Sequence, residues 1–453
     1  MRFSIRMTGR HYEQLVESLL CSEGHEKVAA LFCGRGRTET AEALCVQEVW
    51  PLPNHCYASR SSAEATWDPN QLLNEFYQRR RGSGLCLVHT HPESTTRFSK
   101  LDDAVDHSLL GCASCFMDDG APHASMILTP DGRLTGRFRL ANGVFVGVDY
   151  IHAAGPQLRI FSGSTTAPLV RNKQTYGART ASDLGQLRLG VVGASGIGSP
   201  AAEISVRMGV RNLVLVDPGR VDVKNLNRLI HATQKDAAEK RYKVDVVGDS
   251  LERSGLVVQI ERVRNNLLSP EAIAALKSCD LILSCLDNPL ARSQIERLGA
   301  YYCIPIVDAG VNIGIGADSI LDSAQVRIDY MYPDSPTLLQ RGRYSELDLR
   351  AWAESVDSPE TYRDLVKRGY LPDVDGTEGA PMVATLTCMA AARMVDEVVA
   401  RVAGFRYRDP CEYDGQEFNL CEGTWSLQAF LNGSHYDAVI GRGDCEPPMD
   451  LVG

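Results

Sequence analysis

Two histidines and an aspartate stand at a spacing that could hold a metal ion. His89 and His91 lie in the segment VHTHPESTTRFSKLDD, which also contains Asp102. Residues i and i+2 of a strand face the same side, so both imidazoles are expected together at a strand end, with Asp102 at the start of the next helix. Two imidazoles and a carboxylate with an open fourth position form a catalytic zinc set. A bare His-x-His, however, more often marks surface histidines beside a capping Ser–Asp turn.

The complete string decides between these interpretations. From His89 to Asp102 it reads H-x-H-P, six further residues, then S-x-x-D, and this resembles the JAMM motif of the MPN-domain metalloproteases. The resemblance covers roughly residues 1–150 and implies a zinc isopeptidase that cuts after the C-terminus of ubiquitin or a related protein. It also implies that His89, His91 and Asp102 bind zinc and that Ser99 donates a hydrogen bond to the oxyanion.

A glutamate from an earlier strand activates water in that family. The matching residue is expected to be Glu26, just before the apolar run VAALFCG. Glu48, in QEVWPLP, is the alternative, although it reads first as a surface strand residue. Zinc lowers the pKa of bound water towards neutrality, so the glutamate can take a proton from it and pass the proton to the leaving amine.

A second constellation begins with the glycine-rich turn LGVVGASGIGS. It places Gly193, Gly196 and Gly198 between an apolar strand and a helix, where the backbone can approach phosphate. Asp217 ends the next strand and is well placed for a ribose hydroxyl. These residues alone fit an NAD-dependent dehydrogenase equally well, or a tight structural turn.

Polar and charged residues beyond Asp217 favour an enzyme that splits ATP between its α- and β-phosphates. They are Asn225, Arg228, Lys243, Asp287 and Arg292. Cations hold phosphates and an aspartate holds Mg²⁺, whereas hydride transfer needs no such pair of cations beside the nucleotide. Over about residues 168–405, this set resembles the ThiF/MoeB group, the activating enzymes of ubiquitin-like and sulfur-carrier proteins.

That second resemblance implies a role for each of these residues. Asp217 contacts the ribose, Asp287 binds Mg²⁺, and the phosphates are contacted by Asn225, Arg228 and Lys243. The segment VRNKQTYG resembles the lead-in from which the family often reaches a basic residue, here Arg171 or Lys173, into its partner's site. The resemblance therefore also implies a homodimer through this domain.

Cysteine usage departs from the ThiF/MoeB group at the structural zinc site. The segment YPDSPTLLQRG contains no CxxC pair, and Cys411, Cys421 and Cys445 are not spaced to complete one. Cys112 and Cys115 form the one CxxC pair in the chain, and it has no second pair. No structural zinc is therefore expected.

The usual thioester cysteine is missing as well. No cysteine stands between Cys303 and Cys388, and both of these read first as core thiols. The acyl group is expected to stay as an adenylate, to pass to a partner's cysteine, or to move to a hydroxyl. The candidate hydroxyls are those of Ser345, Ser355, Ser358 and Thr377.

The two constellations require different folds. Residues 1–152 read as an α+β domain with strands at 28–34, 44–54, 84–92, 124–130, 133–140 and 143–150 and helices at 12–20 and 101–111. From 181 to 453, apolar strands at 189–193, 212–217, 257–263, 281–287 and 305–311 alternate with helices from 199 and near 236–254, 270–277 and 289–301. This alternation predicts a Rossmann-like, doubly wound parallel sheet. The polar stretch 153–180 is expected to be a linker and lead-in segment.

Length and composition set broader limits. A chain of 453 residues suggests two or three domains, and 44% hydrophobic residues suffice for full cores. The formal net charge of −10 gives no sign of a nucleic-acid binder. No apolar run reaches the length of a membrane span and the N-terminus has no signal-peptide pattern, so a cytoplasmic protein is expected.

Together the motifs predict a bifunctional enzyme of a ubiquitin-like protein pathway. One domain would cleave after the terminal glycine of a ubiquitin-like protein, and the other would use ATP and Mg²⁺ to adenylate that C-terminus. The fusion resembles those of bacterial operons for ubiquitin-like conjugation, some tied to antiphage defence, and a conjugating-enzyme-like partner is expected. The alternatives are processing and activation of a sulfur-carrier protein for cofactor biosynthesis, or an inactive scaffold.

Overall fold

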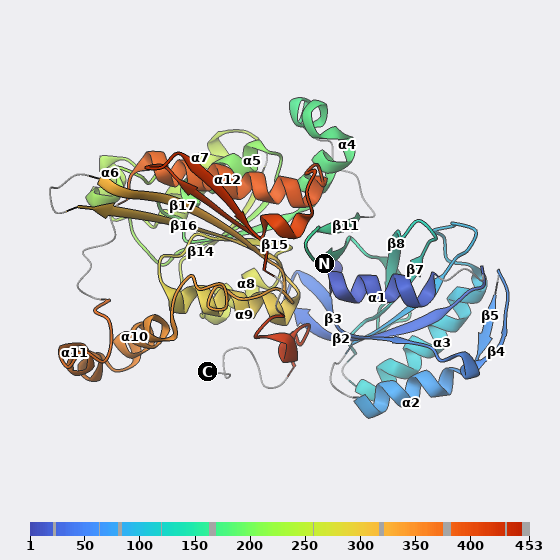
Figure 1. The fold of residues 1–453 in the computed structure, drawn as a ribbon. Coiled ribbons are helices and arrows are strands. Elements are labelled where there is room, and N and C mark those ends of the chain that lie inside the picture. The colour runs from blue at the N-terminus through green and yellow to red at the C-terminus, as the bar shows by residue number, and fades with distance from the viewer. Residues whose placement is uncertain are drawn as a thin grey trace. The chain divides into compact units, whose positions relative to one another are not determined.

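The computed structural model describes the chain apart from short stretches. Those stretches are residues 21–23, 63, 80–83, 119, 163–168, 257, 317–320, 375–381, 431–432 and 446–453. The described residues form two units (Figure 1). One contains Met1–Thr165, Ala300–Cys303 and the segment from Tyr436 onward, and the other contains Thr166–Gly299 and Ile304–His435.

A mixed sheet forms the centre of the first unit. Its strands are β1 (Arg2–Thr8), β2 (Val28–Arg37), β3 (Ala41–Pro51), β6 (Gly84–Thr90), β7 (His123–Leu128), β8 (Leu134–Arg139), β9 (Phe145–Gly147), β10 (Tyr150–Ala154) and β11 (Arg159–Ser162). They are arranged in the order β11-β10-β1-β3-β2-β6-β7-β8-β9. A separate hairpin consists of β4 (Tyr57–Arg60) and β5 (Ala65–Trp67). The predicted α+β architecture is confirmed, and the sheet is mixed, since β1 is parallel to β3 and β10, and β6 to β7.

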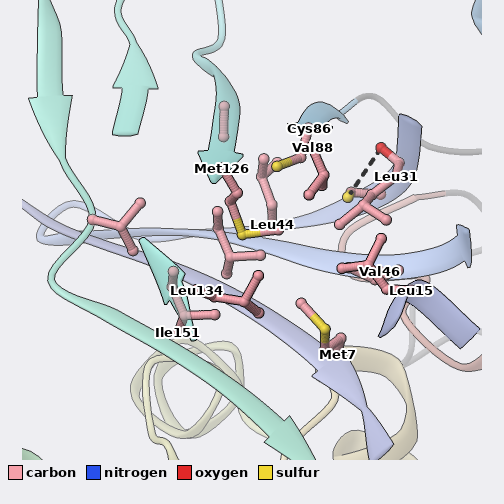
Figure 2. Close-up of a cluster of buried hydrophobic side chains, with 14 of the residues drawn as sticks. Met7, Leu15, Leu31, Leu44, Val46, Cys86, Val88, Met126, Leu134 and Ile151 are labelled. Carbon is pink, nitrogen blue, oxygen red and sulfur yellow. Dashed lines mark hydrogen bonds between the residues drawn. The ribbon is translucent and has the colours of Figure 1, made fainter. Parts of the chain in front are cut away.

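Helices cover both faces of this sheet. They are α1 (Gly9–Leu19), α2 (Pro69–Arg79) and α3 (Lys100–Met117). Side chains alternate along a strand, so Leu31 of β2 packs with Leu15 of α1 in one core cluster (Figure 2), and Phe32 packs on the other face with Leu72 of α2 and Leu110 of α3. Because both faces are covered, β6 is buried along its whole length and reads as an almost unbroken apolar run.

Three expected boundaries in this unit differ from the structure. The helix expected at 101–111 continues to Met117, because Gly111 keeps a helical backbone and the left-handed residue that ends the helix is Asp118, with φ 49°. The strand expected at 143–150 is divided between β9 and β10. The stretch 153–180 contains the end of β10, β11 and part of a long helix, and only residues 163–168 within it lie outside the described part.

A second sheet organises the other unit. Its strands are β12 (Arg188–Val192), β13 (Asn212–Val216), β14 (Gln259–Val263), β15 (Leu281–Ser284), β16 (Ile306–Ile315), β17 (Leu321–Met331), β18 (Gly415–Asn419) and β19 (Thr424–Gln428). Their order is β14-β13-β12-β15-β16-β17-β18-β19. The first five are parallel, which confirms the predicted doubly wound sheet, and the last three extend it in antiparallel fashion.

The helices of this unit are α4 (Val170–Gln186), α5 (Gly198–Arg207), α6 (Gln234–Ala238), α7 (Lys243–Arg253), α8 (Pro270–Leu276), α9 (Pro289–Tyr302), α10 (Glu346–Asp357), α11 (Pro359–Lys367) and α12 (Ala384–Ala403). The helix expected near 236–254 is in fact α6 and α7. Lys240 between them has φ 49°, a left-handed conformation that stops a helix, and Tyr242 caps the next one.

The antiparallel extension has one polar face. Gly310 of β16, Arg327 of β17 and Glu417 of β18 are aligned in one row across the strands, and Asn312 and Gln325 are paired in the adjacent row. The intervening residues of β16 and β17 are apolar. This alternation gives one polar and one apolar face in this part of the sheet.

Among the described helices, none combines the length and the apolar character that crossing a membrane requires.

Candidate functional site

His89, His91 and Asp102 converge on one point in the first unit. Their ligand atoms all lie within 4.8 Å of one another. The Nε2 atoms of the two imidazoles are 3.0 Å apart, and they lie 3.4 Å and 3.5 Å from the two carboxylate oxygens of Asp102. The three residues that the sequence predicts as metal ligands are therefore brought together.

Helix α3 delivers Asp102 to this point through its N-terminal cap. The Ser99 hydroxyl accepts a hydrogen bond from the Asp102 N–H, and the Asp102 carboxylate accepts one from the Ser99 N–H at 2.6 Å. This reciprocal capping box fixes the first turn. Ser99 is thus a capping residue in this structure, and its own O–H remains able to donate.

The register of two strands brings Glu26 to the same place. Val28 of β2 is paired with His89 of β6, and paired residues share a face of the sheet. Because the two strands are antiparallel, Glu26, two residues before Val28, and His91, two residues after His89, come next on that same face. Burial raises the pKa of Glu26, the charges of His89 and His91 lower it, and that of Asp102 raises it again. The carboxyl group is therefore close enough to the cluster to be coupled to all three residues.

Glu48 occupies a different position. It is paired with Phe32, four residues along β2 from Val28, which corresponds to about 13 Å of strand. Its carboxylate is bound by Arg79 of α2, with an Nε–Oε2 distance of 3.2 Å. These contacts match a surface strand residue.

The donor set fits zinc. The Nδ1 atom of His91 is 3.0 Å from the carbonyl oxygen of Thr95, so Nδ1 carries the proton and the Nε2 lone pair faces the cluster. Although burial opposes its charge, the neighbouring His89 and His91 and the Ser99 N–H hold the pKa of Asp102 well below its usual range, so the carboxylate is ionised. Two neutral imidazoles and one ionised carboxylate are the ligands expected of a catalytic zinc site.

The glycine-rich turn follows β12 in the second unit. Gly193 has φ 92°, a left-handed conformation, and a Cβ there would lie 2.6 Å from the carbonyl oxygen of Cys285. A Cβ on Gly198 would run into the carbonyl oxygen of Gly193. Both positions therefore require glycine, and the turn holds the backbone tight at the start of α5.

Asp217 joins this turn to the end of β13. One of its oxygens accepts from the Ala194 N–H at 2.8 Å and the other from the Gly219 N–H at 2.6 Å. The Lys243 ammonium, at the start of α7, is 3.9 Å from the carboxylate. The buried Asn225 accepts a hydrogen bond from the Asp222 N–H, so its amide nitrogen is the atom left to donate to a ligand.

One cavity of about 1710 Å³ contains most of the predicted nucleotide residues. It is lined by Gly193, Gly196, Asp217, Asn225, Arg228, Lys243 and Asp287. Because β13 and β15 flank β12 on opposite sides, the cavity opens where the strand order reverses, which is the usual ligand site of such sheets.

Two predicted residues lie outside the cavity lining. Gly198 is the first residue of α5, where the absence of a Cβ permits close approach to the Gly193 carbonyl oxygen. Arg171 is exposed in the first turn of α4, and its guanidinium donates to Gln174. Within this unit α4 is kinked at Gly177, and Arg171 does not reach the nucleotide residues.

The cavity also contains residues that the sequence analysis missed. Arg327 and Glu417 come from the polar face of the antiparallel strands, and Trp352 and Val356 come from α10. The polar–apolar alternation along 323–329 was a signal that could have revealed this face. The α10 residues carry no such signal, because the wall that they form depends on how the helix packs.

The segment YPDSPTLLQRG, which contains no CxxC pair, is held by buried polar groups. Arg341 donates to the carbonyl oxygens of Pro336, Asp414 and Tyr330 at 2.9 to 3.0 Å. Glu296 of α9 accepts from the Leu338 N–H at 2.6 Å. These bonds anchor the chain between β17 and α10, next to the cavity wall.

Neither core thiol named above lines the cavity. Cys303 is buried in the first unit, and Cys388 is partly buried in α12. Cys285 does line it, but burial raises the pKa of its thiol, which keeps the sulfur protonated.

The candidate hydroxyls have structural roles or lie outside the described residues. Ser345 caps α10 through Asp348, and the Ser355 hydroxyl donates to the Trp352 carbonyl oxygen. Ser358 stands at the N-cap of α11. Thr377 lies outside the described residues.

Comparison with known families covers both units. The ThiF family model matches residues 169–429. The model for prokaryotic homologs of the JAB domain matches residues 8–140. These two matches coincide with the two candidate sites.

Curated relatives match only part of this chain. The molybdopterin-synthase adenylyltransferase of Haemophilus influenzae is 25% identical over 209 residues, which are 45% of this chain and 72% of that protein. The adenylyltransferase and sulfurtransferase UBA4 of Yarrowia lipolytica is 30% identical over 129 residues, 28% of this chain and 31% of that protein. Among solved structures, E. coli MccB with ATP matches at 15% identity and a TM-score of 0.41, over 60% of this chain and 74% of that one.

Proposed function

The chain belongs to the ThiF family and carries a JAB-like domain at its N-terminus, and from this premise we propose that it adenylates the C-terminus of a ubiquitin-like protein. The observation that carries the proposal is the cavity at the carboxyl ends of β12, β13 and β15. There, a glycine-rich turn, two cations and an exposed aspartate share one space. A dehydrogenase would need no such set of charges beside its nucleotide.

The residues divide the work on ATP among them. The backbone of the glycine-rich turn and the start of α5 take the phosphates, and Asp217 accepts a ribose hydroxyl beside its two backbone bonds. Arg228 and Lys243 stabilise the negative charge that develops on the phosphates. Asp287 would hold Mg²⁺, which would offset the negative charge of the phosphates. The substrate carboxylate attacks the α-phosphorus, the bond to the β-phosphate breaks, and pyrophosphate leaves.

The polar sheet face gives the substrate's tail a path to this point. Asn312, Gln325, Arg327 and Glu417 line the same cavity as the nucleotide residues. Trp352 and Val356 supply an apolar wall. An extended C-terminal tail, with polar backbone and small terminal residues, suits such a channel between a polar face and an apolar wall.

Pyrophosphate exchange tests this function. The purified chain, ATP, Mg²⁺ and labelled pyrophosphate are mixed with ubiquitin-like proteins that end in glycine, and each is compared with a version lacking its last two residues. Exchange is expected only with an intact C-terminus. NAD binding without exchange across the panel would contradict the proposal.

We further propose that the first unit is a zinc metallopeptidase acting on the same kind of C-terminus. The supporting observation is the convergence of His89, His91 and Asp102 with the carboxyl group of Glu26 beside them. Zinc held by the two Nε2 atoms and the Asp102 carboxylate would acidify a water molecule and polarise the scissile carbonyl.

The chain's own groups would handle protons and charge in that reaction. Burial raises the pKa of Glu26, which makes its carboxylate a better proton acceptor at neutral pH. Glu26 would take a proton from the attacking water and deliver it to the leaving amine. The Ser99 O–H, which is not used by the helix cap, would donate to the developing oxyanion.

Cleavage of an extended ubiquitin-like protein tests this activity. A substrate with several residues beyond the terminal glycine is incubated with the chain before and after chelation. Cleavage should stop with the chelator and return with added zinc. Cleavage that persists after complete zinc removal would contradict the metallopeptidase proposal.

The pathway is proposed as conjugation, with a homodimer and a conjugating-enzyme-like partner that receives the activated carrier. Sulfur-carrier activation is the second candidate, favoured by relatives named adenylyltransferase and sulfurtransferase. The product distinguishes them, because conjugation yields an amide on a second protein and sulfur transfer yields a thiocarboxylate. Mass spectrometry of the carrier after reaction with a sulfur donor and with the partner separates the two.

A further inference from the structure

A single arginine binds the start of α3 to the sheet. Arg137 of β8 is only 9% exposed. Its Nη1 atom donates to Asp103 at 2.5 Å and its Nη2 atom to Asp106 at 2.6 Å. Asp103 directly follows Asp102, and Asp106 comes one turn later. The guanidinium is thus hydrogen-bonded to the helix on the side that carries Asp102, the third metal-binding residue.

The same guanidinium is stacked between two aromatic rings. Its Cζ atom lies 3.7 Å from the ring centroid of Phe98 and 4.0 Å from that of Phe145. Phe98 in turn meets the imidazole of His89 edge-on, with ring centroids 6.0 Å apart. A planar guanidinium can stack on rings and form two directed hydrogen bonds at once, which a lysine ammonium cannot do.

Arg137 therefore contacts both flanks of the capping box. Phe98 stands immediately before Ser99, and Asp103 stands immediately after Asp102. Ser125 of β7 adds a second bond between the sheet and α3. It is paired with Arg137 on the neighbouring strand, and its hydroxyl donates to Asp106 at 2.5 Å.

The three metal-binding residues differ in what holds them. His89 is in β6, inside the sheet, and His91 follows directly after that strand, whereas Asp102 is placed by the first turn of a helix. The loop between them is irregular, and Ser94 within it has φ 62°. The position of the carboxylate therefore depends on how the first turn of α3 is held relative to the sheet.

We propose that Arg137 is a positioning residue of the metal group, which sets zinc affinity by holding Phe98 and the first turn of α3. This inference rests on the proposed zinc site. Residues outside the ligand set that orient metal ligands typically change metal affinity by about 10–100-fold when they are replaced. We expect a loss of that size for Arg137→Gln and a smaller one for Arg137→Lys, which keeps only the charge.

Arg139 provides a matched control. It lies two residues along β8 and packs over Gly111, in the middle of α3, far from the capping box. Arg139→Gln removes the same charge from the same strand, beside the same helix. Its zinc affinity is expected to match that of the unchanged chain.

Zinc affinity is measured by competition with a chromophoric chelator, and thermal unfolding of the metal-free proteins is recorded alongside. With Co²⁺ in place of zinc, the visible spectrum reports ligand geometry and should change in Arg137→Gln but not in Arg139→Gln. A lower midpoint of metal-free Arg137→Gln with unchanged zinc affinity and spectrum would overturn the inference, because that is the result of a merely structural role. If Arg137→Gln does not fold, Phe98→Leu and Arg137→Lys decide: weakened zinc binding supports the inference and unchanged binding overturns it. Failure of the unchanged chain to bind zinc would instead overturn the metallopeptidase proposal.

Discussion

The carboxyl group of Glu296 in α9 accepts a hydrogen bond from the backbone N–H of Leu338 at 2.6 Å, across 42 residues of chain. Its second oxygen accepts from the Tyr344 hydroxyl at 3.2 Å. The side chain is buried, and this burial raises its pKa to about 8. One buried acid thus anchors the segment that leads to α10, one of the walls of the ATP cavity.

The contribution of Glu296 to the free energy of unfolding should therefore fall as pH rises. A glutamate in the unfolded chain has a pKa of about 4.3, so the folded chain keeps a proton that the unfolded chain releases. The stabilising contribution is complete below the unfolded pKa and is lost as pH approaches the folded value near 8. Glu296→Gln mimics the protonated acid, so from pH 5 to pH 8 it should gain on the unchanged chain by up to about 1.4 kcal/mol per pH unit.

Urea unfolding at several pH values measures this difference. Glu360→Gln, an exposed position in α11, is the control and should show no such trend. Parallel pH profiles for the unchanged chain and Glu296→Gln would show that Glu296 is not protonated in the folded state.

Zinc content tests the metal group directly. The purified chain should hold about one zinc ion, and the double change His89→Ala with His91→Ala should remove it, because one carboxylate cannot retain the ion alone. His107→Ala, an exposed histidine on α3, should keep the zinc. A double variant that retains its metal would place the site elsewhere.

The rate of substrate cleavage by two variants distinguishes Glu26 from Glu48 as the general base. Glu26→Gln should keep zinc but lower cleavage of an extended ubiquitin-like protein by about 10²–10⁴-fold, the usual contribution of a general base. Glu48→Gln should cut at the normal rate, because its carboxylate is paired with Arg79 away from the metal group. Normal cleavage by Glu26→Gln together with reduced cleavage by Glu48→Gln would instead identify Glu48 as the general base.

Asp287→Asn should reduce ATP–pyrophosphate exchange by about 10²-fold or more, because the developing charge on the phosphates loses its metal ligand. Zinc-dependent cleavage should be unchanged, since Asp287 lies in the other unit. Asp364→Asn, which breaks an exposed ion pair in α11, is the control. Normal exchange by Asp287→Asn would exclude this residue as the Mg²⁺ ligand.

No reducible thioester through a cysteine of the crossover segment is expected on this chain. Cys303 and Cys388 lie outside the cavity lining, and Cys285, which is within it, keeps its proton because burial raises its pKa. After reaction with ATP, Mg²⁺ and the matching ubiquitin-like protein, gels with and without reductant should show the same bands. A reductant-sensitive band that disappears in Cys285→Ser or Cys388→Ser would identify a cysteine nucleophile instead. A band that resists reductant but yields to hydroxide would indicate an ester on a hydroxyl.

The sequence by itself indicated the parallel part of the second sheet, several strands of the first, and the short motifs that carry both candidate sites. Short, nearly continuous apolar runs marked the buried strands, and the alternation of strands and helices predicted the parallel sheet, because both signals are local. The glycine-rich turn and the H-x-H…S-x-x-D string are likewise short, and their backbone demands can be read from the residue types. Element ends were not specified in this way: the sequence placed the end of α3 at Gly111, but Gly111 keeps a helical backbone and the helix ends at the left-handed Asp118.

Only the tertiary structure decided which distant residues join these motifs. Glu26 lies beside the zinc ligands because β2 and β6 pair with Val28 opposite His89, and the strand pattern alone does not specify that register. The same holds for Arg137, whose partners come from α3, β7 and the loop before Ser99. It holds as well for Glu417 and Trp352 in the ATP cavity. Such contacts depend on packing between segments far apart in the chain, and that information is not carried by any single stretch of residues.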